Sequence, residues 1–278
     1  MSRYPSKILL FGEYAIIHHS MALAIPYQGF YGTWKKSTQK HDTNLFADYL
    51  DDLEIEDILF DRRLYDLDQS EGYFFTSNIP QGYGVGSSGS LTAAFYERYL
   101  IRNREFPIVK LMDIFAQMES YFHGSSSGFD PMISYLNYGL IIGTDKEATV
   151  IKKNQRKKYI FYLINSRKSR ETAPLVKLYK EKYLQDTFKS GITELIKLNE
   201  KAIHAYLNNT EDLKDIFHQI SILEYDLFPE MIISSIKRTY QKLNLKLCGA
   251  GGGGFYLGIT EKVNIPTLIR EHDIILIE

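Results

Sequence analysis

Nine glycines lie in two short stretches of this chain, and their placement constrains the fold more than any other feature of the sequence. Four fall within residues 82–89 and five within residues 249–254, although the whole chain of 278 residues has only 19. Glycine adopts backbone angles that other residues avoid, and it lets the backbone approach another group closely. The sequence therefore indicates two places where the backbone lies against a ligand or another segment.

Composition and charge exclude several classes of protein. Apolar residues make up 44% of the chain and charged residues 24%, which is typical of a globular protein rather than a disordered or fibrous one. The formal net charge of −1 gives no reason to expect a nucleic-acid or membrane partner. There is no signal-peptide pattern, and the single cysteine, Cys248, cannot form an internal disulfide. We expect a cytoplasmic protein.

The pattern of apolar residues predicts an α+β protein of two domains. In the first half, strands are predicted at 7–11, 14–17, 29–34, 73–75 and 139–144. Helices are predicted after residue 90 and over 107–122. Residues 51–68 are predicted to be an acidic, solvated stretch, and residues 123–130 a loop. In the second half, a strand at 159–164 precedes helices near 173–189, 192–208, 211–226 and 229–243, then strands at 246–248, 255–259 and 274–277 with a short helix after Pro266. The composition shifts near residue 150, so we expect domains over 1–155 and 156–278.

The first glycine cluster has the composition of a phosphate-binding loop. Residues 80–90 are Pro-Gln-Gly-Tyr-Gly-Val-Gly-Ser-Ser-Gly-Ser, and a predicted helix follows. A glycine-rich turn that opens a helix points several N–H groups at one place, where the helix dipole also favours an anion. The lysine of a Walker loop and the lysine and His-Arg-Asp loop of protein kinases are missing. A dinucleotide-binding fingerprint matches Gly84–Gly89, but neither the preceding strand nor the later acidic residue is there. A flexible turn is the remaining alternative.

Three segments together resemble the motifs of the GHMP kinases. Residues 5–13 (Pro-Ser-Lys-Ile-Leu-Leu-Phe-Gly-Glu) resemble the first motif, residues 80–88 the phosphate-binding second motif, and residues 246–254 (Lys-Leu-Cys-Gly-Ala-Gly-Gly-Gly-Gly) the third. Residues 123–130 (His-Gly-Ser-Ser-Ser-Gly-Phe-Asp) resemble a segment of the mevalonate kinases, the members that the chain resembles most. The resemblance spans almost the whole chain. It implies a two-domain GHMP kinase fold, with a ribosomal protein S5 domain 2-like N-terminal domain that carries loop 80–90 and a ferredoxin-like C-terminal domain that carries glycine loop 248–254.

The resemblance also implies a reaction and a set of site residues. The reaction is ATP- and Mg²⁺-dependent transfer of the γ-phosphoryl group to the hydroxyl of mevalonate, or a similar acidic alcohol, in isoprenoid precursor synthesis. Asp130 would face the acceptor hydroxyl, Lys7 would stabilise the developing charge, and Ser88 and Glu119 would bind Mg²⁺. The implied ATP-phosphate-binding residues are Gly82, Gly84, Val85, Gly86, Ser87, Ser88, Gly89, Gly251 and Gly252. The implied substrate-binding residues are Glu13, Tyr14, Arg170, Gly249 and Ala250. The two glycine clusters are expected to face each other across one cleft.

The chain departs from the mevalonate kinases at several positions. Tyr14 replaces a histidine and looks more like phosphomevalonate kinase, Ser126 replaces a proline, and Gly89 and Ser90 replace two alanines. Four alternatives stay open: phosphomevalonate kinase, another GHMP kinase with a different small alcohol, an ATP-dependent diphosphomevalonate decarboxylase, and a non-catalytic ATP- or sugar-sensing relative. The role of Asp130, as a general base or an electrostatic aid, also stays open. The protein would act on a small molecule as a monomer or a homodimer.

Overall fold

The structure is a computed structural model that describes residues 2–37, 42–143, 147–151, 158–170 and 172–277. These residues form two compact units, each assembled from separate segments of the chain. The first unit comprises Met1–Lys7, Ile25–Pro80 and Gly86–Gly139, and the second comprises Ile8–Ala24, Gln81–Val85 and Leu140–Glu278. The predicted domain boundary between residues 155 and 156 lies outside the described residues.

One sheet of five strands contains the N-terminal strand that carries Lys7. Its strands are β1 (Tyr4–Phe11), β2 (Ala22–Lys36), β4 (Tyr73–Ser77), β6 (Gly139–Ile142) and β7 (Ala148–Ile151). Their order is β1-β2-β6-β7, and β4 pairs with β2 beside this path. All eight residues of β1 are buried, because apolar side chains occupy both of its faces. Lys7, the fourth residue of β1, is therefore held in a largely apolar interior.

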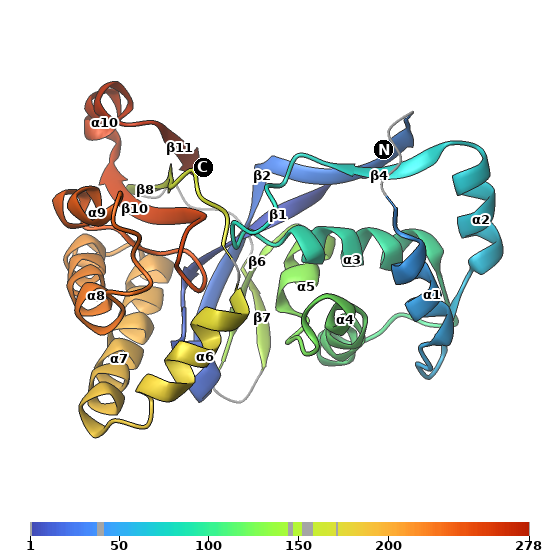
Figure 1. Cartoon of the computed structure of the whole chain (residues 1–278), viewed down its shortest axis with the longest axis horizontal. Helices are drawn as coiled ribbons and strands as arrows, with labels where there is room; N and C mark the ends of the chain where they lie inside the picture. Colours follow the sequence, from blue (N-terminus) through green and yellow to red (C-terminus); the bar gives the residue numbers. More distant parts are fainter. Residues whose placement is uncertain (1, 38–41, 144–146, 152–157, 171, 278) are drawn as a thin grey trace. The chain divides into compact units, whose positions relative to one another are not determined.

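The described residues of the first unit form five helices and a small second sheet, which pack around an aromatic core. The helices are α1 (Asn44–Asp52), α2 (Arg62–Ser70), α3 (Ser87–Tyr99), α4 (Ile108–His123) and α5 (Phe129–Leu136), and the small sheet joins β3 (Ile58–Phe60) to β5 (Leu100–Arg102). Helix α3 packs against both α4 and α5 (Figure 1). The core is aromatic: Trp34 meets Tyr99 edge to face, with ring centroids 5.0 Å apart.

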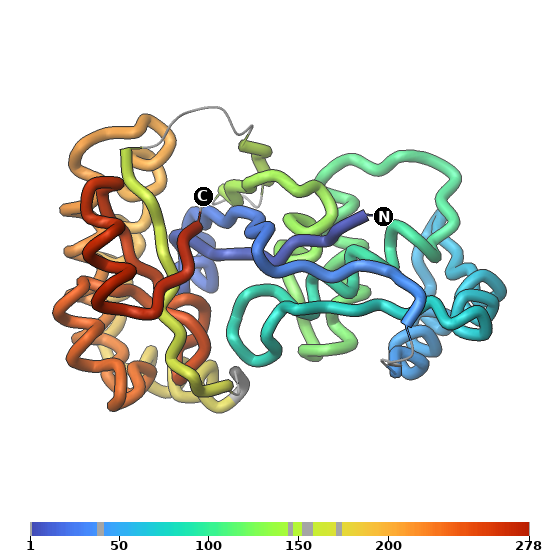
Figure 2. Tube along the Cα trace, turned by 90° about the horizontal axis from the view of Figure 1, so that it is seen from above, coloured from blue at the N-terminus to red at the C-terminus, as the bar shows by residue number. Residues whose placement is uncertain are grey.

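The second unit is built on a four-stranded antiparallel sheet. Its strands are β8 (Tyr159–Asn165), β9 (Lys246–Leu247), β10 (Phe255–Glu261) and β11 (Ile274–Ile277), in the order β11-β8-β10-β9. Numbered along the chain this order is 4-1-3-2, the order of a ferredoxin-like sheet. The strands β8 and β11 run side by side although more than 100 residues separate them (Figure 2). The second unit therefore has the predicted ferredoxin-like topology.

Helices α7 and α8 pack against each other in this second unit, and α8 also contacts β9 and β10 (Figure 1). Its helices are α6 (Thr172–Lys182), α7 (Asp186–Asn208), α8 (Leu213–Leu227), α9 (Lys237–Leu243) and α10 (Ile265–Glu271), with short 3₁₀ helices η1 (Ala15–His18) and η2 (Lys262–Asn264). In the described part of the chain, no helix is both long enough and apolar enough to span a membrane.

Most predicted elements are present, but the strand predicted at 14–17 is wrong. The chain leaves β1 through Gly12 (φ 117°) and Tyr14 (φ 58°), and 3₁₀ helix η1 follows. Positive φ values at both residues reverse the chain, so the apolar run of η1 cannot continue the strand. The helix predicted over 229–243 begins only at Lys237, and the predicted loop 123–130 ends early because α5 begins at Phe129.

Candidate active site

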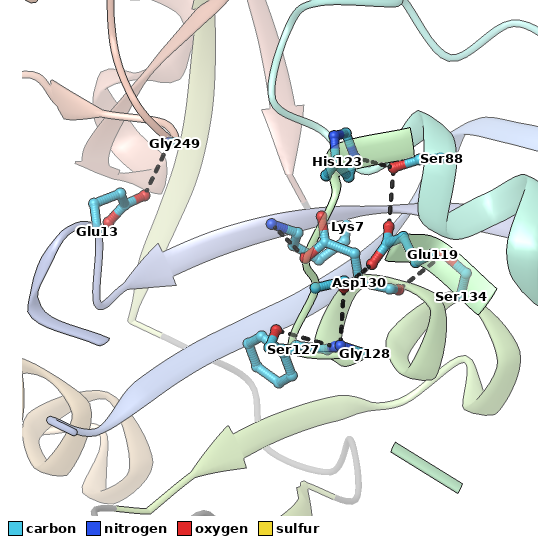
Figure 3. Close-up of polar contacts among 12 residues, drawn as sticks. Lys7, Glu13, Ser88, Glu119, His123, Ser127, Gly128, Asp130, Ser134 and Gly249 are labelled. Atoms are coloured by element: carbon cyan, nitrogen blue, oxygen red, sulfur yellow. Dashed lines mark hydrogen bonds and ion pairs between the residues drawn. The ribbon is translucent and has the colours of Figure 1, made fainter. Parts of the chain in front are cut away.

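Lys7 and Asp130 form an ion pair in the first unit. Lys7 Nζ lies 2.9 Å from Asp130 Oδ1, and the two side chains are 8% and 29% exposed (Figure 3). Asp130 lies in the first turn of α5, where the helix dipole stabilises a negative charge. The lysine is therefore held inside the unit, while its carboxylate partner remains accessible to a small molecule.

Two serine hydroxyls and one glycine fix the elements around this pair. Ser134 donates to the carbonyl oxygen of Pro5 (2.7 Å) and Ser90 to that of Tyr4 (2.8 Å), so α5 and α3 are each tied to β1. A Cβ atom on Gly89 would lie 2.7 Å from the backbone carbon of Asp130. Glycine at this position lets α3 and α5 meet backbone to backbone, which places the first turn of α3 beside Asp130.

The N-terminus of α3 begins after a glycine N-cap and lies beside the ion pair. Gly86 precedes the helix with φ 76° and, as a glycine, has no side chain to cap the N–H groups of the first turn. A Cβ atom on Gly86 would lie 3.2 Å from Lys7 Cβ and 3.5 Å from Asp130 Oδ2. The N–H groups of a helix start bind anions, so Gly86, Ser87, Ser88 and Gly89 can hold phosphate oxygens close to Lys7 and Asp130.

Glu119 is a buried carboxylate that faces Ser88. Ser88 Oγ donates to Glu119 Oε1 (2.9 Å) and Ser126 Oγ donates to Glu119 Oε2 (2.5 Å), while His123 Nε2 lies 3.0 Å from Ser88 Oγ (Figure 3). Burial raises the pKa of Glu119 to about 7, and the negative charge of Asp130 contributes to this rise. The hydrogen bonds from Ser126 and Ser88 and the positive charge of Lys7 act in the opposite direction and lower the pKa. A cation beside Glu119 would offset these effects by favouring its ionised form.

The oxygen donors at Ser88 and Glu119 fit a magnesium ion that also binds phosphate. Magnesium takes oxygen ligands and usually keeps several waters, so one or two protein ligands are enough when phosphates supply others. Among the described residues, no three histidine, cysteine, aspartate or glutamate side chains come together as a metal-binding group. Two such oxygen donors suit an Mg²⁺ ion whose other ligands are phosphate oxygens and water.

The remaining predicted site residues lie in the second unit. Gly82, Gly84 and Val85 belong to this unit. A Cβ on Gly84 would be 3.0 Å from the Cys248 carbonyl oxygen, and one on Gly254 would be 2.7 Å from the Tyr83 carbonyl oxygen, so residues 83–84 lie against the second glycine cluster and the residue before it. Gly251 and Gly252 have φ values of 76° and 74°, and the N–H of Gly252 already donates to the Met231 carbonyl (2.6 Å). The predicted substrate-binding residues Glu13, Tyr14, Arg170, Gly249 and Ala250 all lie around this segment.

Glu13 belongs to a buried network of charges in this second unit. It forms an ion pair with Lys246, which is fully buried, and its Oε1 accepts from the Gly249 N–H at 3.4 Å (Figure 3). Glu224 Oε2 in turn accepts from the Leu247 N–H (2.7 Å) and the Tyr240 hydroxyl (3.1 Å). Both carboxylate oxygens of Glu13 therefore have partners within the protein: Oε2 pairs with Lys246 and Oε1 accepts from Gly249.

Sequence reasoning missed two side chains that contact the predicted metal ligands. Ser126 donates to Glu119, and His123 contacts Ser88. Ser126 stands where the mevalonate kinases have proline, so a hydroxyl in place of an apolar ring was an available signal. His123 ends α4 one turn after Glu119, and this spacing places the two residues on one face of the helix.

Comparison with known proteins relates the chain to one family. Residues 57–138 match the family model described as the GHMP kinases N terminal domain. No curated protein matches the chain. Many solved structures match, among them the Methanococcus jannaschii mevalonate kinase, with 19% sequence identity, a TM-score of 0.70, and coverage of 99% of this chain and 96% of that one.

Two further matching structures are complexes with bound ligands. The L. major mevalonate kinase in complex with R-mevalonate has 15% identity and a TM-score of 0.67, and the match covers 97% of this chain and 90% of that one. The Streptococcus pneumoniae phosphomevalonate kinase in complex with phosphomevalonate and AMPPNP has 13% identity and a TM-score of 0.66, with 97% and 94% covered. At these identities the likeness shows a shared fold along nearly the whole chain. Residues 57–138 thus match the GHMP kinase N-terminal domain, and the chain as a whole has a fold that resembles the mevalonate kinases.

Proposed function

We propose that this protein is an ATP- and Mg²⁺-dependent kinase that transfers the γ-phosphoryl group to the hydroxyl of mevalonate. The observation that carries the proposal is the Lys7–Asp130 pair beside the N-terminus of α3, which follows the glycine N-cap Gly86. Phosphoryl transfer requires mainly the positioning of the reactants and the neutralisation of charge. A lysine, an accessible carboxylate and a phosphate-binding helix start within one unit supply these requirements.

Each residue would have a defined task in this reaction. Asp130 accepts a hydrogen bond from the acceptor hydroxyl, orients its oxygen and takes up its proton. Lys7 is held 2.9 Å from Asp130 and provides positive charge at the same place. The N–H groups at the start of α3 bind phosphate oxygens, and Ser88 and Glu119 would hold the metal. Mg²⁺ bound there would neutralise phosphate charge during transfer.

Mevalonate is proposed as the acceptor because residues 123–130 resemble a mevalonate kinase segment and the fold resembles those enzymes. One observation favours a second candidate, phosphomevalonate. Tyr14 occupies the position at which mevalonate kinases have histidine, and the fold also resembles the S. pneumoniae phosphomevalonate kinase. Both acceptors are anionic, but mevalonate would take the phosphoryl group on its hydroxyl and phosphomevalonate on its phosphate, so the choice between them requires a direct assay.

A coupled ADP-release assay tests the proposal. Purified protein is assayed with Mg²⁺·ATP and R-mevalonate, phosphomevalonate, homoserine or galactose, and separately with diphosphomevalonate while CO₂ release is followed. We expect mevalonate to give the highest kcat/KM, with no turnover when EDTA removes Mg²⁺. CO₂ release from diphosphomevalonate would instead identify a decarboxylase. Folded protein that binds ATP but turns over none of these compounds would refute a catalytic role and favour the sensing relative.

A further inference from the structure

The backbone of the segment Cys248–Gly251 is held by side chains that come from two distant parts of the sequence. The carbonyl groups of Cys248, Ala250 and Gly251 each accept a hydrogen bond from a side chain, and the N–H of Gly249 donates to one. The side chains involved are Glu13, Tyr14 and Arg170, and all the atoms lie in the second unit. Four consecutive residues are therefore fixed through their peptide groups.

Arg170 makes the largest number of these contacts. Its Nη1 donates to the carbonyl oxygens of Cys248 (3.0 Å) and Gly251 (3.3 Å). Its Nη2 lies against two glycines, because a Cβ atom would be only 2.0 Å from it on Gly84 and 2.3 Å from it on Gly249. Each glycine belongs to a different cluster, so the guanidinium fills space that any larger residue at either position would occupy.

The backbone of Arg170 strengthens this link. Its N–H donates to the carbonyl oxygen of Gly82 (3.1 Å). Arg170 therefore contacts the segment Gln81–Val85 through its main chain and the segment Cys248–Gly251 through its side chain. A planar guanidinium can donate to two carbonyl groups in fixed directions, which a lysine ammonium cannot reproduce with the same geometry.

Tyr14 reaches the same segment from a strained backbone. It has φ 58°, an uncommon value for a bulky residue, and its ring stacks on Tyr179 (centroids 4.5 Å apart) and on Phe228 (4.8 Å). The stacked ring directs the hydroxyl to the Ala250 carbonyl oxygen, 2.7 Å away. Burial raises the pKa of Tyr14, so the hydroxyl keeps its proton and donates it to this bond.

We propose that Glu13, Tyr14 and Arg170 are positioning residues. Their side chains form a clamp that holds the backbone of the segment Cys248–Gly251, and Arg170 also joins this segment to residues 81–85. The polar groups of Tyr14 and Glu13 are engaged in this clamp, which gives these residues a task other than contact with the acceptor. The consequence for catalysis rests on the proposed kinase function: the clamp would pre-form the phosphate-facing loop before any ligand arrives.

Hydrogen exchange of the ligand-free protein tests the clamp without reference to activity. The amides of Gly249, Gly252 and Gly254 are hydrogen-bonded, so their exchange reports opening of the segment. We expect about tenfold faster exchange across residues 248–254 in Arg170→Lys and about fivefold in Tyr14→Phe, because each loses hydrogen bonds to these carbonyls. Exchange in β8 and β10 should stay as in the wild type.

Two control variants make the same substitutions, arginine to lysine and tyrosine to phenylalanine, at positions outside the clamp. Arg167→Lys changes an arginine three residues away whose side chain is 79% exposed and pairs with Asp273. Tyr183→Phe changes a tyrosine of the same aromatic stack whose hydroxyl, among the described residues, bonds to none of the glycine-rich segment. Both controls should exchange as the wild type does. Unchanged exchange in Arg170→Lys and Tyr14→Phe would overturn the clamp, and so would faster exchange spread evenly over the second unit.

Steady-state kinetics separate positioning from direct contact with the acceptor. Displacement of the segment should raise the KM for ATP together with that for the acceptor in both variants. A rise confined to the acceptor's KM, with unchanged exchange, would show that these side chains bind the acceptor instead. A protein that turns over no acceptor but shows the expected exchange would keep the clamp and refute the kinase, so the two proposals fail separately.

Discussion

Lys7 Nζ lies 2.9 Å from Asp130 Oδ1, and the two partners differ in their access to solvent. The lysine side chain is 8% exposed and the carboxylate 29%. The lysine extends from a strand whose eight residues are all buried, whereas the carboxylate lies at the first turn of a helix. The pair thus presents a partly accessible carboxylate backed by a buried cation, an arrangement suited to orienting a hydroxyl group.

Replacing Asp130 by asparagine should abolish most turnover while ATP binding persists. Asparagine keeps the size of the side chain but cannot accept the proton, so we expect kcat to fall about 10²–10⁴-fold. Binding of ATP, measured by calorimetry, should change little, because the phosphates would be held by the N–H groups of α3. Asp113→Asn, an exposed change on α4, is the control. Wild-type turnover in Asp130→Asn would remove Asp130 from the mechanism.

Lys7→Met should lower turnover about as much as Asp130→Asn, and combining the two changes should cost little more. Residues that act as one unit show strongly non-additive effects on kcat. Methionine preserves the apolar length of the side chain within β1, so circular dichroism should show a folded protein. Multiplicative losses in the double variant would contradict joint action of the two residues.

Glu119→Gln and Ser88→Ala should each raise the Mg²⁺ concentration needed for half-maximal activity. Ser88→Ala removes an oxygen ligand of the ion, whereas Glu119→Gln keeps one neutral oxygen but removes the counter-charge, so we expect at least about a tenfold rise for Glu119→Gln. Ser126→Ala leaves both proposed ligands in place and removes only the hydroxyl that donates to Glu119 Oε2. It should have the smallest effect of the three. Normal Mg²⁺ dependence in Glu119→Gln would refute its role as a ligand.

The grouping of Lys7, Ser88, Glu119 and Asp130 was predicted from the resemblance to the GHMP kinase motifs, and local backbone shape explains part of it. Glycines before α3 and α5 start those helices, and the helix starts bring Ser88 and Asp130 to one place. The contact between Ser126 and Glu119 did not follow, since it depends on the turn between α4 and α5 rather than on either motif.

The wrong strand at 14–17 and the acidic stretch at 51–68 show where local pattern fails. Tyr14 is held in its turn by Tyr179 and Phe228, which lie more than 160 residues later, and no local pattern contains that contact. The acidic stretch was predicted as a solvated face, yet Asp68 is 5% exposed and pairs with Arg98. In both places a partner from another element outweighs the local propensity.

The stability of the second unit should depend on pH through Glu224. Burial raises the pKa of Glu224 to about 7, despite the opposing charge of Lys246. A carboxyl whose pKa is raised on folding binds its proton more tightly in the folded state. The contribution of Glu224 protonation to the free energy of unfolding is therefore fully present below about pH 4.5, and it is lost as the pH rises to about 7.

Glu224→Gln removes this titration but keeps an oxygen that can accept from Leu247 and Tyr240. The free energy of unfolding of the variant minus that of the wild type should therefore increase by about 3 kcal/mol between pH 4.5 and pH 8. Urea titrations across this range measure the difference. Glu194→Gln, an exposed change on α7, should show no such trend. A constant difference between Glu224→Gln and the wild type would contradict the linkage.

Gly89→Ala should destabilise the first unit and reduce turnover, because its methyl group would overlap the backbone of Asp130. The added Cβ would lie 2.7 Å from the carbonyl carbon and 2.8 Å from the Cβ of Asp130. Backbone atoms at a helix contact cannot move aside individually, so α3 and α5 must separate. We expect a loss of about 1–3 kcal/mol in the free energy of unfolding. Moving Asp130 away from Lys7 should also lower kcat beyond the effect on stability.

Gly191→Ala on α7 is the matched comparison. The new methyl group would lie 2.5 Å from Leu227 Cδ2, the end of a flexible side chain that can rotate away. Gly89 lies in the first turn of α3 and Gly191 inside α7, so alanine favours each helix by up to about 1 kcal/mol, and the difference between the variants reports mainly the contact. Gly191→Ala should be nearly neutral in thermal unfolding. Equal stability of the two variants would show that α3 and α5 are not in backbone contact at Gly89.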